Sequence, residues 1–93
     1  MKLFLIHCGF YDQGLAEASP NIFEGHHNFY VIATDRHEAK QKAKEKTLFK
    51  EKKMHIDGIH EIDQVDGYRI ILEKVASSGH EIKVTDYDEV QTI

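Results

Sequence analysis

The sequence predicts an α+β domain in which a single mixed or antiparallel sheet of about five strands carries one main helix on one face. Dense β-forming segments surround a single Lys-, Glu- and Ala-rich segment, in the order strand, strand, helix, strand, strand, strand. An apolar content of 41% with 30% charged residues excludes a disordered chain, a collagen-like repeat and a membrane span. Because 93 residues hold only one core, we expect a single domain over 1–93, with a frayed acidic tail at 86–93.

The first two predicted strands are separated by a long connection. Residues 2–8 (KLFLIHC) are apolar on both alternating faces, which is typical of a central strand covered on both sides. Residues 9–26 contain Gly, Pro and Asn and are expected to form a connection with a helical turn near 15–18. Residues 27–34 (HNFYVIAT) are rich in β-formers and predict the second strand.

The main helix is predicted over about residues 36–50. Asp35 and Glu38 have the three-residue spacing of a capping box, which marks a helix start. The narrow apolar stripe of this helix consists of Ala39 and Ala43, extended by Thr47 or Leu48. Small residues in the stripe favour close packing on a sheet and leave the lysines facing water.

The C-terminal part of the sequence predicts a meander. An Asp-Gly pair at 66–67, between β-forming segments at 59–65 and 68–73, is the signature of a two-residue hairpin. A further turn at 77–79 leads to an expected edge strand at 80–85.

Charge is distributed unevenly along the chain. The formal net charge is −4, but residues 35–54 carry eight basic and four acidic residues, whereas residues 55–93 carry three basic and nine acidic residues. A net negative chain does not supply the basic field that neutralises phosphates, so we expect no nucleic-acid binding. The basic middle and the acidic C-terminal part favour self-association instead.

The single cysteine indicates the compartment. Cys8 has no partner for an intramolecular disulfide, and it is expected to be buried and inert. Small secreted domains usually carry disulfides, so a reducing cytoplasm is expected. The apolar N-terminal run is too short for a signal peptide and is interpreted as a strand, so no membrane association is expected.

Five blocks along the chain resemble a known family. They are, in order, KLFLIHCGF, Glu24-x-His26 before FYVIA, EAKQKAKEK, His55-Ile56-Asp57 and VDGYRI. Over about residues 2–73 the sequence resembles the bacterial family known as domain of unknown function 1543. The resemblance implies a bacterial protein with one copy of a domain that relatives carry once or twice, and it implies no activity.

Two pairs of residues are the candidate site. In Glu24-x-His26 and His55-x-Asp57 the members of each pair point to the same side of an extended chain. Each pair offers an imidazole and a carboxylate, which suit a divalent metal such as zinc or manganese. The structural alternative is that Glu24 caps a loop, that His26 bonds a backbone carbonyl, and that His55 and Asp57 terminate the preceding helix.

The preferred interpretation is a non-enzymatic binding or assembly domain that self-associates as a homodimer and needs no cofactor. The alternative is a metal-dependent or acid–base enzyme in which Glu24, His26, His55 and Asp57 act together. In that enzyme the histidines serve as bases or ligands, and the carboxylates as ligands or orienting groups. Convergence of the four side chains discriminates between the two interpretations, and the sequence specifies no substrate, protein partner or small-molecule ligand.

Overall fold

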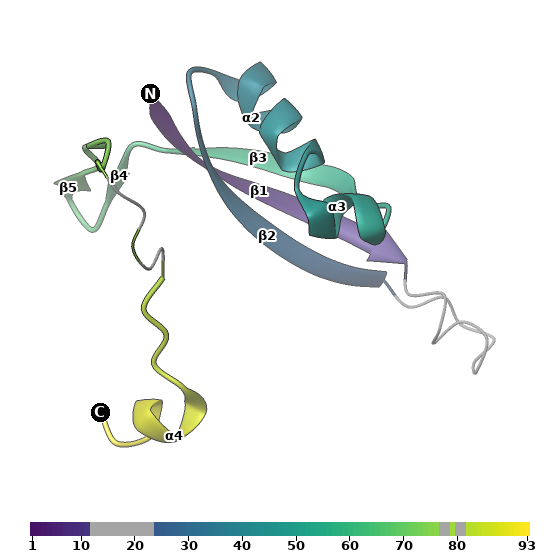
Figure 1. Ribbon diagram of the computed structural model, residues 1–93. Helices are drawn as coiled ribbons and strands as arrows, with labels where there is room; N and C mark the ends of the chain where they lie inside the picture. The colour runs from purple at the N-terminus through teal and green to yellow at the C-terminus, as the bar shows by residue number, and fades with distance from the viewer. Residues whose placement is uncertain (12–23, 77–78, 80–81) are drawn as a thin grey trace.

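A computed structural model describes residues 1–11, 24–76, 79 and 82–93. Its elements in chain order are β1 (Lys2–Tyr11), β2 (Glu24–Ala33), α2 (Arg36–Lys44), α3 (Thr47–Glu51), β3 (His55–Ile62), β4 (Gln64–Val65), β5 (Tyr68–Arg69) and α4 (Tyr87–Val90). The α+β class is confirmed, and the described residues contain five strands (Figure 1). These strands are divided between a three-stranded antiparallel sheet, in the order β2-β1-β3, and a separate β4-β5 hairpin.

The central strand β1 fixes the arrangement of the other two long strands. Both β2 and β3 pair antiparallel with β1, so they run parallel to one another on its two sides. The helices α2 and α3 return the chain from the end of β2 to the start of β3. As a result, the first residues of β2 and β3 lie at the same end of the sheet, where Glu24 pairs with Tyr11 and His55 pairs with Gly9.

All three long strands begin or end outside their predicted limits. β1 continues past the predicted end at Cys8, β2 starts three residues early at Glu24, and β3 starts at His55 instead of residue 59. The extension follows from pairing, because each added residue except Asp57 has a partner on a neighbouring strand for its backbone N–H and C=O. The predicted 9–26 connection is therefore shorter, and the helical turn predicted at 15–18 lies outside the described residues.

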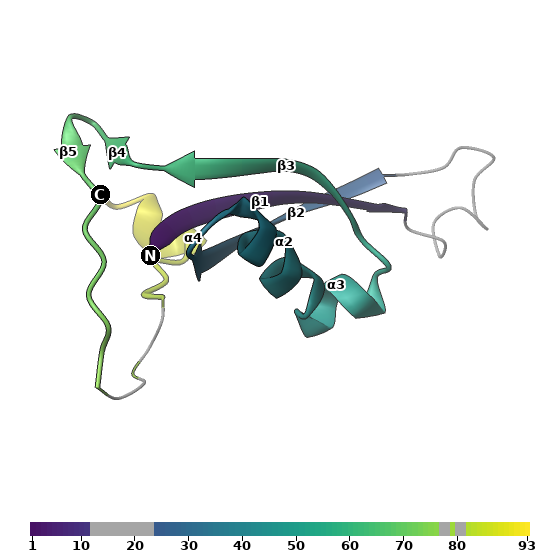
Figure 2. The ribbon, with the colours of Figure 1, turned by 90° about the horizontal axis from the view of Figure 1, so that it is seen from above.

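The core lies between the sheet and the two helices, which cover the same face (Figure 2). It contains Phe4, Ile6, Cys8, Val31, Ala33, Ala39, Ala43 and Met54. The prediction that β1 is covered on both sides is wrong for the part of the chain that is described. On the other face, here called the open face, Leu3 and Leu5 are half-buried and Tyr30 is 62% exposed.

The predicted helix over 36–50 is interrupted at residues 45–46. A continuous helix would place Lys46, Thr47 and Lys50 on the stripe that begins with Ala39 and Ala43. Ending α2 at Lys44 and restarting at Thr47 instead lets Leu48 and Phe49 pack against the core. The predicted N-cap is confirmed, because the Asp35 carboxylate accepts from the Glu38 N–H at 2.8 Å.

A tight turn after α3 directs the chain into β3. Lys53 has a left-handed backbone with φ of 49°, and two backbone bonds close the helix end, from Met54 N–H to Phe49 C=O at 3.0 Å and from Lys53 N–H to Lys50 C=O at 3.2 Å. This pattern is a Schellman motif, which usually has glycine at the left-handed position. Buried Met54 then leads directly to His55.

The predicted Asp-Gly turn is confirmed, but the strands beside it are short. Asp66 and Gly67 have φ of 53° and 82°, as a type I′ turn requires. Only two residues pair on each side, and the hairpin forms a sheet separate from β1. The meander predicted from residue 59 to residue 73 is therefore reduced to this hairpin.

The expected edge strand at 80–85 is not found in its described part. Residues 82–85 are not in a strand, and residues 80–81 lie outside the described part. The edges of the three-stranded sheet are β2 and β3 instead. In the predicted tail, Asp86 caps the short helix α4, which lies away from the sheet (Figure 1). None of the helices in the described residues is long and apolar enough to cross a membrane.

Candidate metal centre

Histidines and carboxylates from three strands gather on the open face, at the end where β2 and β3 begin. This polar cluster consists of His7 from β1, Glu24 and His26 from β2, and His55 and Asp57 from β3. All four residues proposed from the sequence therefore lie in one place. They are joined by His7, which the sequence reasoning did not include.

The tightest part of the cluster is centred on His55. Its Nε2 lies 3.3 Å from Glu24 Oε1 and 3.2 Å from Asp57 Oδ1. One donor atom from each of these three residues lies within 4.8 Å of the other two. The three side chains are 34–41% exposed, so the group is open to water on its outer side.

Gly9 provides the space beneath this group. A Cβ built on Gly9 would stand 2.6 Å from His55 Nε2, 2.7 Å from Asp57 Oδ2 and 2.8 Å from Glu24 Oε1. Real Cβ atoms essentially never make contacts this short. The backbone of Gly9 is outside the left-handed region, so conformation does not require glycine here. What requires glycine is the close approach of three ligand-type atoms.

A β-bulge in β3 places Asp57 on the open face. His7 pairs with Gly58 and Cys8 pairs with Ile56, so Asp57 is an extra residue between two register positions. In a regular strand with no bulge, residues three apart such as Ile56 and Ile59 would point to opposite faces. With the bulge both isoleucines pack against the core, while His55 and Asp57 stay together on the open face. Bulges that aim a side chain are common beside functional sites.

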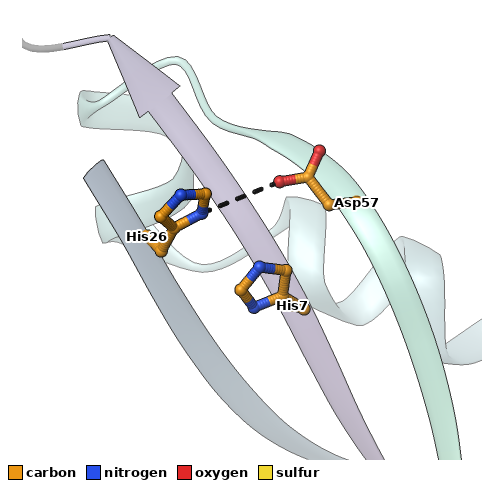
Figure 3. A group of neighbouring side chains, drawn as sticks. All are labelled: His7, His26 and Asp57. Atoms are coloured by element: carbon orange, nitrogen blue, oxygen red, sulfur yellow. Dashed lines mark ion pairs between the residues drawn. The ribbon is translucent and has the colours of Figure 1, made fainter. Parts of the chain in front are cut away.

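A second group shares Asp57 with the first. His7, His26 and Asp57 also offer donor atoms within 4.8 Å of one another, and Figure 3 shows the three side chains on one side of the sheet. Nδ1 of His26 lies 4.0 Å from Asp57 Oδ2, and the rings of His26 and His7 stack with centroids 5.1 Å apart. The two oxygens of Asp57 therefore face different histidines.

Asn28 holds the ring of His7. The distance from His7 Nδ1 to Asn28 Oδ1 is 2.7 Å, and an amide oxygen can only accept. Nδ1 therefore donates, and Nε2 is the ring nitrogen that keeps its lone pair for a ligand. Histidines that bind metals typically donate their other N–H to an oxygen in this way.

The charge and spacing of the His55 group suit a divalent cation. Ligands about 2.05 Å from a tetrahedral zinc ion are separated from one another by about 3.3 Å, which the two distances at His55 match. Among the described residues, histidines are the only ion-pair partners of Glu24 and Asp57. Two carboxylates without a lysine or arginine beside them leave negative charge for a cation to neutralise.

A match to a protein family covers most of these residues. The family model described as Domain of Unknown Function (DUF1543) matches residues 21–72, more than half of the chain. The chain belongs to the DUF1543 family. No curated protein and no solved structure matches it. Within this DUF1543 domain, Glu24, His26, His55 and Asp57 fall inside the matched range, whereas His7 and Gly9 on β1 precede it.

Two of the three structural alternatives from the sequence do not describe the DUF1543 domain. Glu24 is the first residue of β2 rather than a loop cap. α3 ends at Glu51, so His55 and Asp57 lie in β3 and do not terminate a helix. Cys8 points to the helix-covered face and is fully buried. Burial raises the pKa of its thiol, and the nearby charge of Asp57 raises that pKa further.

Two members of the site could not be found from sequence spacing alone. His7 and Gly9 are two residues apart on β1, so alternation places them on the same face. Their roles depend on which residues of β2 and β3 lie beside them, and that follows only from the register. Tyr11, two residues further, completes this face of β1 with its ring centroid 5.7 Å from that of His55.

Proposed function

We propose that this domain binds a divalent transition-metal ion through Glu24, His55 and Asp57. The observation that supports the proposal is the convergence of three donor atoms over Gly9, at distances that suit a metal polyhedron. Imidazole nitrogen and carboxylate oxygen together favour zinc or a neighbouring first-row ion. His26 lies beside the group and completes the set of four residues.

The proposed ion has coordination positions that water can reach. Three protein ligands with a remaining position open to water are typical of catalytic zinc sites, whereas structural sites are closed by four protein ligands. The half-exposed side chains of the His55 group support this openness. The metal-dependent enzyme is therefore the interpretation that the site favours, and the class of substrate is left to the experiments.

Metal titration of the full chain tests the proposal. Zinc added at about 100 times its dissociation constant stabilises a one-site protein by about 2.7 kcal/mol. For a domain of this size, that corresponds to a rise in melting temperature of roughly 10–20 °C. Calorimetry should give saturable binding, and Co²⁺ in place of zinc should give the absorption of a low-symmetry nitrogen and oxygen site.

Two single substitutions of histidines on β3 provide the test and its control. We expect His55→Gln to lose most of the affinity for zinc, while His60→Gln, an exposed histidine also on β3, keeps it. An unchanged melting temperature with added zinc would contradict the proposal. Equal affinities for the two variants would contradict it as well. The competing account is a metal-free ion-pair cluster, in which His55→Gln lowers the stability of the zinc-free protein and zinc has no effect.

We also propose that two copies of this bacterial, cytoplasmic domain associate through the other end of the open face. That apolar end carries Leu3, Leu5, Tyr30, Ile32 and Ile62, with the exposed His60 paired beside Leu5. A strand with apolar residues on both faces is usually covered on both, and α2 and α3 cover only one face of β1. A second copy supplies a matching apolar surface. A fold whose one cysteine is free and buried suits the reducing cytoplasm.

Light scattering after size-exclusion chromatography tests the association. We expect a dimer that Ile32→Lys converts to a monomer, because Ile32 lies on the apolar end and is 37% exposed. Val65→Lys, at an exposed position of the β4-β5 hairpin, should leave the dimer intact. A monomer of the wild type at all concentrations would refute the association.

A further inference from the structure

The carboxylate of Asp57 lies between His55 and the stacked rings of His26 and His7. Oδ1 is 3.2 Å from His55 Nε2. Oδ2 is 4.0 Å from His26 Nδ1, the ion pair that Figure 3 marks with a dashed line. A carboxylate whose two oxygens face different ligand groups has the arrangement of a bridge between two metal ions. Metal pairs of this kind stand about 3.5–4 Å apart, which one carboxylate can span.

The second ligand group is supported by its own hydrogen bond. Asn28 accepts from His7 Nδ1 at 2.7 Å and orients Nε2 as the free nitrogen of that ring. The His7 ring stacks on His26 with an angle of 14° between the planes, so the two imidazoles lie side by side on the open face. A conventional reason for holding a half-buried histidine in one tautomer on a sheet surface is ligation at its other nitrogen.

We propose that the polar cluster binds two divalent cations bridged by Asp57. The first is the ion of the proposed function, held by Glu24, His55 and Asp57, and the second is held by His7, His26 and Asp57. This inference rests on that proposed function, because the shared carboxylate serves both ions. Three imidazoles and two carboxylates form a borderline nitrogen and oxygen donor set, which suits Zn²⁺, Co²⁺ and Mn²⁺.

The order of binding follows from the geometry. The His55 group already has donor distances of 3.2 and 3.3 Å, whereas the 4.0 Å between His26 and Asp57 is wider than the separation of about 3.3 Å that a tetrahedral ion favours. The first ion is therefore expected to bind more tightly than the second. A titration should show two steps, with one equivalent of metal bound before the other.

Stoichiometry measured on the full chain tests the inference. Calorimetric titration with Zn²⁺, together with metal analysis after gel filtration, should give two equivalents per chain for the wild type. His7→Gln should give one, while His60→Gln should give two. Asn28→Ala, at an exposed position of β2, should weaken only the second step, because it frees the ring of His7 without removing a ligand. Far-ultraviolet circular dichroism of each metal-free variant checks that the fold is kept.

The outcomes separate the two proposals. One equivalent in the wild type, unchanged by His7→Gln, overturns the bridged pair and leaves the single site standing. No bound metal overturns both. Two equivalents that His7→Gln does not reduce would also overturn the assignment of His7. With Mn²⁺, electron paramagnetic resonance should show the signal of a coupled pair in the wild type and of an isolated ion in His7→Gln, and an isolated-ion signal in both would refute the bridge.

Discussion

Replacement of Gly9 by alanine should separate the proposed metal binding from folding in this domain. The added methyl group would stand 2.6–2.8 Å from three donor atoms, whereas ordinary contact begins at 3.4 Å, so each donor has to retreat by 0.6–0.8 Å, the difference between those values. Metal–ligand distances vary by only about 0.2 Å in well-formed sites. We therefore expect Gly9→Ala to weaken zinc binding at least about 100-fold, equivalent to about 2.7 kcal/mol.

The same substitution should spare the fold. The three donors belong to partly exposed side chains that can move toward water, and Gly9 does not have a left-handed backbone. Glycine within a strand is less favourable than alanine by about 0.5–1 kcal/mol, so the metal-free variant should be as stable as the wild type or slightly more so. Thermal unfolding with and without zinc, in parallel with calorimetry, measures both quantities.

Gly58→Ala is the matched control, because the atoms nearest to its Cβ would be in the His60 ring, at 3.2 Å, and the Cβ of His7, at 3.9 Å. We expect its affinity for zinc to stay within about threefold of the wild type, a change of about 0.6 kcal/mol. Unchanged zinc affinity in Gly9→Ala would refute the reasoning, since the space above Gly9 would then not be the site. A Gly9→Ala variant that fails to fold without metal would show that the glycine serves packing instead.

Three further outcomes follow from the scaffold. Lys53→Gly should raise the free energy of unfolding in urea by about 0.5–1 kcal/mol, because glycine suits the left-handed turn after α3, and a loss of stability would contradict that assignment. Hydrogen bonds from the Thr34 hydroxyl and from Lys42 lower the pKa of Glu38. The ionised Glu38 therefore stabilises the fold above its unfolded-chain pKa of about 4.3, and this stabilisation is lost as the pH falls through the lower pKa of the folded state. Glu38→Gln should therefore flatten the decline in stability below that pH, as measured by acid titration of the circular dichroism signal. The thiol of Cys8 should react with a thiol reagent only after unfolding in denaturant, and rapid labelling of the native protein would show that β1 opens easily.

The sequence predicted the elements better than their lengths and pairings. The Asp35 cap and the Asp-Gly turn were predictable because each depends on residues close together in the chain. The extension of β1 to Tyr11 was not, since it depends on pairing with Glu24 and its neighbours. The break between α2 and α3 depends on which side chains face the sheet, which local helix propensity does not contain.

The candidate site was predictable in part for the same reason. Spacing placed Glu24 with His26 and His55 with Asp57, but only the register around β1 brings the two pairs over Gly9. His7 was not among the candidates, because it has no carboxylate two residues away along the chain. Alternation along the strand sends its side chain to the open face and that of Cys8 to the core.

The position of a bound ion decides whether the His55 group is a metal centre. Crystals of the full chain grown with zinc, measured on both sides of the zinc absorption edge, locate the metal by its anomalous scattering. A peak is expected above Gly9, about 2.0–2.2 Å from His55 Nε2 and from oxygens of Glu24 and Asp57. Saturating zinc that produces no peak on the open face, or a peak only at other histidines, would contradict the proposed metal centre.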